Sequence, residues 1–259
     1  MKKFNFKIEA GDQNVGTAYI PDTKGVNCPV VIYCHGWPGT RRLEEAGADL
    51  CERLTSRGAA LVTFDFFASG ETGGSQTDFS FGRWAFNLND VFDWVASQSW
   101  ADPDKIGIWG FSAGSSTALR FAAQHPKPRF VVSIGSLIGL CTQMPNPPGK
   151  VLVEQWDKAV AGGPLRMKDT EINLEFFKDF IAGQPVHFLH QIKCPVFFLE
   201  GSADNPYRRT DGWLGFLIMQ RNGQSVKHLE IEGGNHGLFN CGSERNGIIL
   251  GYLKELNFI

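Results

Sequence analysis

The chain has 259 residues, of which 42% are apolar and 20% are charged, as expected for one large globular domain with a sizeable core. Its formal net charge of −2 argues against nucleic acid or an anionic membrane surface as a partner. The N-terminal residues lack the apolar centre of a signal peptide, and no apolar run is long enough to cross a bilayer. We therefore expect a cytoplasmic protein with no membrane span.

The cysteines predict free thiols rather than a disulfide framework. None of them forms a C-x-x-C pair, and several lie in or beside apolar strand candidates, which indicates a reduced compartment. A secreted protein whose signal has been removed is the alternative. The six residues are Cys28, Cys34, Cys51, Cys141, Cys194 and Cys241.

Apolar runs of strand length alternate with segments of helical periodicity along most of the chain. Strands are predicted at Phe4–Glu9, Val15–Ile20, Pro29–Cys34, Ile106–Trp109, Phe130–Leu137, Pro195–Glu200 and Lys227–Glu232, with another at Ala59–Phe66. Helices are predicted at Leu43–Arg57, Trp84–Ser97, from Ser115 to Gln124, and at Arg245–Leu256. The first two strands form a hairpin, and the later alternation predicts an α/β domain with a mostly parallel eight-stranded sheet flanked by helices.

One segment interrupts this alternation without starting a second domain. Residues 138–193 separate two predicted strands, and a simple crossover is much shorter. We interpret this segment as a lid inserted into a single domain that spans residues 1–259. Its large apolar side chains either anchor the insertion to the core or form walls of a binding site: Met144, Trp156, Met167, Phe176, Phe177 and Phe180.

The stretch Lys105–Gln124 contains the strongest chemical signal. A short apolar run is followed by Gly110-Phe111-Ser112-Ala113-Gly114 and then by small or helix-forming residues up to His125-Pro126. A serine at a sharp strand-to-helix turn needs small neighbours, because side chains two positions away would collide. The pattern predicts that Ser112 is an activated nucleophile; the alternative is an ordinary turn that happens to contain serine.

A base and an orienting carboxylate are predicted at the ends of two later strands. Asp204 follows Pro195–Glu200, and His236 follows Lys227–Glu232 in a glycine-rich loop. The chain order Ser112, Asp204, His236 is the order expected when the nucleophile sits at such a turn. Asp211 is the rival acid. Asp65 and the other histidines, His125, His187, His190 and His228, are interpreted as structural or exposed.

Two backbone amides are predicted to stabilise an oxyanion. One belongs to Ala113, directly after the serine, and the other to Trp37, because Pro38 in the same loop has no N–H to donate. His35 is expected to fix this loop without taking part in proton transfer. The sequence has no metal-ligand spacing and no phosphate-binding glycine loop, so we expect neither a metal nor a cofactor.

These motifs together resemble those of the α/β-hydrolases over nearly the whole chain. The resemblance is carried by His35-Gly36-Trp37-Pro38-Gly39, Gly110–Gly114, Gly201-Ser202-Ala203-Asp204 and Gly233-Gly234-Asn235-His236-Gly237. Its size, hairpin and insertion are similar to those of small cinnamoyl/feruloyl-type carboxylesterases, and to catalytic domains of prolyl-oligopeptidase-like enzymes. The chain departs from many relatives in two places. The loop from Asp65 to Gly70 lacks an arginine, and Ser115 replaces a second glycine.

The resemblance implies the α/β-hydrolase fold and a serine carboxylester hydrolase that works through an acyl-enzyme. The aromatic residues of the insertion predict esters of aromatic or medium apolar acids as small-molecule substrates. An exopeptidase or amidase using the same residues is one alternative, and a non-catalytic binding protein with the hydrolase fold is another. A homodimer is left open.

Overall fold

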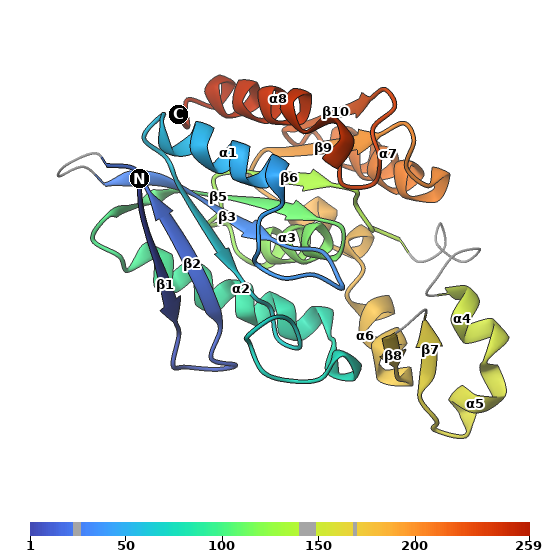
Figure 1. Cartoon of the computed structure of the whole chain (residues 1–259). Helices are drawn as coiled ribbons and strands as arrows, with labels where there is room; N and C mark the ends of the chain where they lie inside the picture. Colours follow the sequence, from blue (N-terminus) through green and yellow to red (C-terminus); the bar gives the residue numbers. More distant parts are fainter. Residues whose placement is uncertain (23–26, 140–148, 168–169) are drawn as a thin grey trace.

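The computed structural model describes residues 1–22, 27–139, 149–167 and 170–259. Within these ranges, eight strands form one sheet in the order β1-β2-β4-β3-β5-β6-β9-β10 (Figure 1). The strands β1 and β2 pair antiparallel, β2 pairs antiparallel with β4, and all later pairs are parallel. This confirms the predicted mostly parallel eight-stranded sheet. The strands are β1 (Lys2–Lys7), β2 (Val15–Ile20), β3 (Cys28–Cys34), β4 (Ala60–Phe64), β5 (Ala101–Phe111), β6 (Val131–Ile134), β9 (Val196–Gly201) and β10 (Val226–Ile231).

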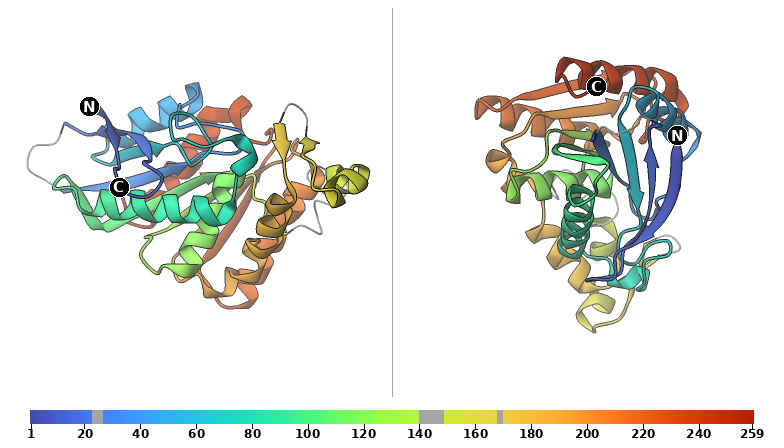
Figure 2. Two further views of the ribbon diagram at one scale, coloured as in Figure 1. Left: turned by 90° about the horizontal axis from the view of Figure 1, so that it is seen from below. Right: turned by 90° about the vertical axis from the view of Figure 1, so that its left-hand side faces the viewer.

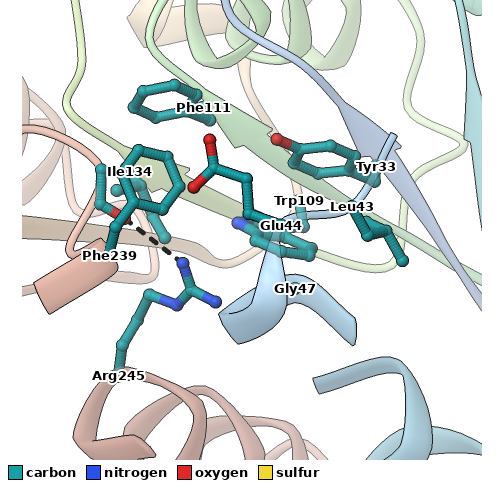
Figure 3. A pocket seen from close by; sticks show the side chains of 10 residues that line it. Tyr33, Leu43, Glu44, Gly47, Trp109, Phe111, Ile134, Phe239 and Arg245 are labelled. Carbon is teal, nitrogen blue, oxygen red and sulfur yellow. Dashed lines mark hydrogen bonds between the residues drawn. The ribbon is translucent and has the colours of Figure 1, made fainter. Parts of the chain in front are cut away.

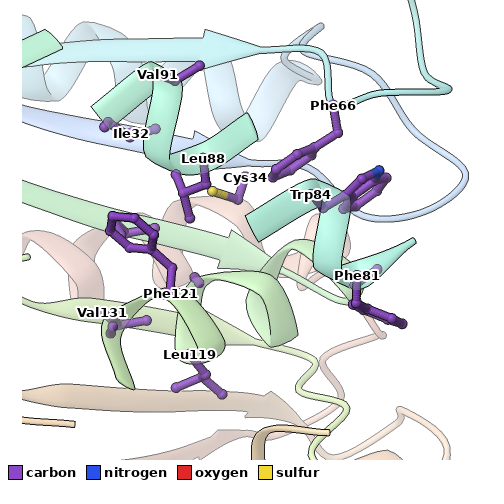
Figure 4. Packing of buried hydrophobic residues seen from close by; sticks show 14 of the residues in the cluster. Ile32, Cys34, Phe66, Phe81, Trp84, Leu88, Val91, Leu119, Phe121 and Val131 are labelled. Atoms are coloured by element: carbon purple, nitrogen blue, oxygen red, sulfur yellow. The ribbon is translucent and has the colours of Figure 1, made fainter. Parts of the chain in front are cut away.

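Helices cover both faces of this sheet (Figure 2). On one face lie α1 (Glu45–Thr55) and α8 (Gly242–Glu255), over a buried cluster that includes Leu50 and Ile249. On the other face lie α2 (Phe81–Ala96), α3 (Ala113–Gln124) and α7 (Pro206–Arg221), over a second cluster. Figure 4 shows Trp84 and Leu88 of α2 among Ile32, Cys34 and Phe121. Burying these side chains removes apolar surface from water and fixes the sheet between its two helical layers.

The structure differs from the sequence-based expectation at several element ends. The first strand lies two residues earlier than predicted, and α2 begins at Phe81 rather than at Trp84 because the Ser80 hydroxyl accepts a hydrogen bond from the Arg83 amide as an N-cap. The helix α7 was not predicted. Its buried positions are Asp211, Gly212, Gly215 and Met219, so the helical face that contacts the core is largely polar or small and gives no apolar periodicity.

The inserted segment between β6 and β9 has its own short elements. These are α4 (Gly149–Glu154), α5 (Trp156–Val160), the antiparallel pair β7 (Leu165–Met167) and β8 (Thr170–Ile172), and α6 (Leu174–Ala182), followed by short 3-10 turns at Pro185–His187 and Leu189–Gln191. In Figure 1, α4 and α5 project outward, whereas α6 lies beside α2. None of the helices in the described ranges has the length and hydropathy that a membrane span requires.

A single carboxylate fastens α6 to the body of the domain. Asp179 accepts hydrogen bonds from the backbone amides of Phe81 and Gly82, which open α2, and lies 3.9 Å from the Arg120 guanidinium of α3. These amides have no partner within their own helix, so a carboxylate placed there both satisfies them and interacts favourably with the helix dipole. The inner part of the insertion is thereby anchored to the domain, while α4 and α5 have no equivalent contact with α2.

We expect Asp179→Ala to lower the free energy of unfolding by about 1–2 kcal/mol, because two helix-terminal amides and Arg120 lose their partner. Asp157→Ala, on the exposed α5, is the matched control and should change stability by less than about 0.5 kcal/mol. Urea denaturation of both variants measures this difference. Equal stability of the two variants would show that Asp179 does not anchor the insertion.

Candidate active site

The turn between β5 and α3 holds Ser112 in a backbone conformation that side-chain-bearing residues rarely adopt. Its φ is 53° and its ψ is −120°, and the residue is 7% exposed. A Cβ atom at Gly110 would lie 2.5 Å from the Cα of Ser115, and one at Gly114 would lie 2.2 Å from the carbonyl oxygen of Cys34. Only glycine fits at either position, so the start of α3 packs directly against the end of β3.

The structure brings Asp204 and His236 together although 31 residues separate them in the chain. His236 Nδ1 is hydrogen-bonded to Asp204 Oδ2 at 2.7 Å, and Asp204 Oδ1 accepts a hydrogen bond of 2.6 Å from the Asn205 amide. The Asp204 side chain is 4% exposed, whereas the imidazole is 26% exposed. A buried carboxylate of this kind fixes the ring orientation and requires the proton to be on Nδ1, which leaves Nε2 as a base.

The turn after β6 connects this pair to the serine. The Ser112 amide donates a hydrogen bond of 2.8 Å to the carbonyl oxygen of Ile134. The next residue, Gly135, has φ +60°, and a Cβ there would lie 2.7 Å from Cε1 of the His236 ring. The ring of Phe111 is also 5.1 Å from the imidazole. No hydrogen bond joins Ser112 Oγ to His236 in this structure; such bonds commonly form fully only when substrate is bound.

The loop after β3 is fixed by a buried histidine. His35 is 1% exposed; its Nε2 accepts from the Phe66 amide at 3.2 Å, so its Nδ1 carries the proton and donates to the Gly36 carbonyl at 2.7 Å. Burial lowers the pKa of His35 to about 4, which keeps the ring neutral. Because C=O and N–H point in opposite directions across a trans peptide, fixing the Gly36 carbonyl also fixes the Trp37 amide on the other side.

Arg41 supplies the cation that the loop from Asp65 to Gly70 lacks in its own sequence. Asp65 is fully buried and accepts hydrogen bonds from the Arg41 amide at 2.6 Å, from the Arg41 guanidinium, and from the Glu71 amide at 2.9 Å. This ion pair ties the loop that carries Trp37 to the loop that follows β4. The sequence gives no local sign of this ion pair, because Arg41 comes from a different loop, 24 residues away from Asp65.

A cluster of buried carboxyl groups lies behind Asp204. Asp211 is fully buried, and its Oδ2 accepts from the amides of Ile138 and Gly139 at 3.2 and 3.3 Å. Glu200, at the end of β9, is fully buried, and a Cβ at Gly212 would lie 2.1 Å from its Oε1. Burial raises the pKa of Glu200 well above its usual range, the charges of Asp204 and Asp211 raise it further, and the amide and hydroxyl of Ser136 lower it.

The aromatic side chains of the insertion divide into two groups. The Trp37 ring lies 5.0 Å from Phe79 and 5.9 Å from Phe176 of α6, with Phe177 buried behind them. Trp156, in contrast, is 56% exposed on α5, at the outer end of the insertion, so it does not anchor the insertion to the core. Met144 and the side chains of Met167 and Phe180 lie outside the described residues. Phe79, Phe176 and Phe177 are 4%, 5% and 2% exposed and belong to the hydrophobic core, so the two insertion residues among them, Phe176 and Phe177, anchor the insertion, as one of the two alternatives expects.

Five cysteines lie in the described ranges, and all are free thiols. Burial raises the pKa of Cys51 and of Cys194 to about 12, and that of Cys34 well above its usual value, so these thiols stay protonated. Cys141 lies outside the described residues. In the described ranges, no cluster of three His, Cys, Asp or Glu side chains is arranged to hold a metal. That the protein needs no metal or cofactor stays a prediction.

Comparison with known sequences places the chain in a family. A family model described as the alpha/beta hydrolase fold matches residues 29–204, which is more than half of the chain. The chain therefore belongs to the alpha/beta hydrolase fold family.

Curated relatives match over shorter stretches. The polyketide transferase claH of Penicillium crustosum is 30% identical over 105 residues, which are 40% of this chain and 34% of that protein. The lysophosphatidylserine lipase ABHD12 of Gallus gallus is 33% identical over 100 residues, which are 39% of this chain and 25% of that protein. The match thus spans about a third or less of each relative's length.

Solved structures share the fold over almost the whole chain. The structure of ferulic acid bound to Est1E from Butyrivibrio proteoclasticus superposes with a TM-score of 0.75 at 17% identity, covering 94% of this chain and 95% of that one. An acylaminoacyl peptidase of Pyrococcus horikoshii superposes with a TM-score of 0.76 at 17% identity, covering 98% of this chain and 41% of that one. These likenesses confirm the predicted fold.

The contact between Gly135 and the imidazole generates a testable prediction. Gly135→Ala should reduce hydrolysis of an activated ester by at least about a hundredfold, because the new methyl group displaces the His236 ring from the serine. Gly162→Ala is the matched control: its φ is +75°, but no atom lies within 4 Å of the new Cβ. Both variants place alanine at a positive φ, and the Gly135 variant adds the contact with His236. Equal activity of the two variants would contradict the placement of the ring.

The buried Glu200 generates a prediction about stability. The native state keeps a proton that the unfolded chain releases above its ordinary pKa of 4.5, so stability falls as pH rises from that value towards the native pKa, by up to about 1.4 kcal/mol per pH unit. Glu200→Gln removes this loss. We expect E200Q to melt increasingly above the wild type as pH rises from 5 to 8.

Glu232→Gln, at an exposed position after β10, serves as the control and should follow the wild type at every pH. The groups whose charges act on Glu200 are Asp204, Asp211 and Arg208, all of which are retained in both variants. Thermal melts at intervals of half a pH unit measure the effect. If the difference in melting temperature between E200Q and the wild type does not change with pH, Glu200 is ionised in the native state.

Proposed function

We propose that this protein is a serine carboxylester hydrolase that works through an acyl-enzyme, with Ser112 as nucleophile, His236 as base and Asp204 as its orienting carboxylate. The observation that carries the proposal is the strained Ser112 turn packed beside the hydrogen-bonded His236–Asp204 pair. A strained turn costs of order 1–3 kcal/mol, and proteins retain such turns mainly where function requires them.

In the proposed reaction, His236 Nε2 accepts the proton of Ser112 as the serine oxygen attacks the ester carbonyl. Asp204 stabilises the imidazolium that forms, and His236 then gives the proton to the departing alcohol. In the second half, His236 takes a proton from water, which attacks the acyl-enzyme, and then gives that proton to Ser112 Oγ as the acid leaves. Ser112 and His236 are thereby returned to their starting state.

The amides of Trp37 and Ala113 are the proposed oxyanion donors. Ala113 is the first residue of α3, and the first amides of a helix have no partner within that helix. The Trp37 amide is fixed by the hydrogen bond between His35 and the Gly36 carbonyl. A Cβ at Gly36 would lie 3.2 Å from the Cβ of Ser112, so this loop passes next to the nucleophile. Two fixed donors near one atom stabilise charge that develops there.

The triad assignment predicts a specific ranking of variants. Ser112→Ala should reduce ester hydrolysis by roughly a millionfold. Asp204→Asn should reduce it about ten-thousandfold, because the amide favours the wrong imidazole tautomer. Asp211→Asn should cost less than about tenfold, because an asparagine oxygen can still accept from the Ile138 and Gly139 amides.

Steady-state kinetics on an activated acetate ester measure all three variants, and circular dichroism checks that each is folded. A reversed ranking of the two aspartate variants would show that Asp211 is the acid. Turnover by S112A near the wild-type rate would contradict the whole assignment. If the wild type hydrolyses aminoacyl amides faster than esters, the alternative of an exopeptidase or amidase is favoured. If the folded wild type hydrolyses neither, a binding protein is favoured.

The acyl group is proposed to be aromatic or of medium apolar size. This proposal is supported by the row of rings formed by Trp37, Phe79 and Phe176, which starts at the loop after β3 and extends onto α6. Burying a phenyl ring against such a surface is worth roughly 2 kcal/mol by area, which corresponds to more than a tenfold preference. The Est1E structure with ferulic acid supports this proposal, because it shows an aromatic acid bound to the same fold.

Phe176→Ala and Trp156→Ala test this acyl preference as a matched pair. We expect Phe176→Ala to lower the ratio of kcat/KM for a cinnamate-type ester to that for an acetate ester by at least about fivefold, because the wall beside Trp37 loses a ring. Trp156→Ala, at an exposed position of α5, should leave the ratio unchanged. If the wild type prefers acetate, or if both truncations leave the ratio unaltered, the aromatic-acid proposal is wrong.

A further inference from the structure

A small cavity lies behind the loop that carries His236, on the face of the sheet covered by α1 and α8 (Figure 3). Its volume is about 20 Å³, enough for one water molecule or one monatomic ion. Two of its walls, Phe111 and Gly237, are the immediate chain neighbours of Ser112 and His236. The cavity is therefore adjacent to the candidate active site, but it lies on the face of the sheet that is covered by α1 and α8, not on the face covered by α3.

The guanidinium of Arg245 lines this cavity and has no carboxylate partner. Arg245 is 1% exposed; its Nε and Nη2 donate to Asn246 Oδ1 at 3.0 and 2.9 Å, and its Nη1 donates to the Gly237 carbonyl at 3.3 Å. Both acceptors are neutral. No carboxylate in the described ranges lies within ion-pair distance of Arg245. The charges of Glu44 and Asp49 act on this guanidinium from beyond ion-pair distance, so the buried cation has counter-charges nearby but none in direct contact.

The other inner polar groups of the cavity are hydrogen-bond donors. Trp109 is 3% exposed, and its indole Nε1–H has no partner in the described part of the chain; this group can only donate. The hydroxyl of Tyr33 also faces the cavity, and burial raises its pKa, so it keeps its proton and can turn to donate it. Figure 3 shows these groups around the same space, with the Glu44 side chain drawn among them.

We propose that this cavity binds one monatomic monovalent anion, of the chloride class, between Arg245, Trp109 and Tyr33. The anion supplies a counter-charge in direct contact with the guanidinium and accepts a hydrogen bond from the Trp109 indole, which has no acceptor in the described part of the chain. Glu44 belongs to an exposed position at the start of α1, so its carboxylate reaches solvent and repels an anion at the mouth of the cavity. It therefore competes with an anion for the same donors.

Occupation of this site stabilises the loop after β10. Arg245 already holds the Gly237 carbonyl, and an anion fixes the guanidinium that does so. The expected consequence is a halide-dependent increase in thermal stability, with the largest effect on residues next to His236. This inference concerns binding and does not depend on the proposed catalytic activity.

The test uses bromide for location and chloride for affinity. Crystals soaked in sodium bromide should show an anomalous peak in the cavity between Arg245 and Trp109. In solution, sodium chloride should raise the melting temperature along a saturable curve when sodium gluconate keeps the ionic strength constant. Trp109→Phe removes the donor and keeps the ring, and should weaken chloride binding about tenfold.

Glu44→Gln removes the competing charge and should tighten chloride binding about tenfold, whereas Glu45→Gln, at the next exposed position outside the cavity, should leave it unchanged. The proposal is overturned if the cavity shows no anomalous signal. It is equally overturned if melting temperatures in chloride and gluconate coincide for the wild type and E44Q.

Discussion

The close packing of the start of α3 against the end of β3 is the constraint on which the candidate site depends. Gly114 touches the carbonyl oxygen of Cys34, and Gly110 touches Ser115, so neither position accepts a side chain. The same contact forces Ser112 to a positive φ. It also brings the amide of Ala113 next to the loop of Gly36 and Trp37. Backbone proximity thus shapes the Ser112 turn and the proposed oxyanion site together.

The remaining groups are placed by loops that are fixed individually to this centre. His35 fixes the peptide before Trp37, and the Arg41–Asp65 ion pair ties that loop to the one after β4. Gly135 determines how near the imidazole approaches, and Asp204 determines its tautomer. These hydrogen bonds and this ion pair hold the loops in the absence of substrate, so the proposed catalytic groups are organised before substrate binds. Such preorganisation is what makes electrostatic stabilisation effective in a transition state.

The sequence was sufficient to predict the sheet and the strand ends that carry Ser112, Asp204 and His236, because buried parallel strands and the G-x-S-x-G turn leave strong local patterns. It was insufficient where a contact joins distant segments. Arg41 gives no local sign that it pairs with Asp65. The α7 helix buries Asp211 and Gly212 instead of an apolar stripe, so the sequence has no apolar periodicity that would predict this helix. The place of Trp156 could not be predicted, since its exposure depends on how the insertion folds back.

The central claim is that Ser112 is the activated nucleophile of this protein. Incubation with an alkyl fluorophosphonate, followed by intact-mass measurement and peptide mapping, tests it most directly. The account predicts one adduct per chain, located on the peptide that contains Ser112, absent in S112A and strongly slowed in D204N. An unlabelled wild-type protein, or an adduct on any other residue, would contradict it.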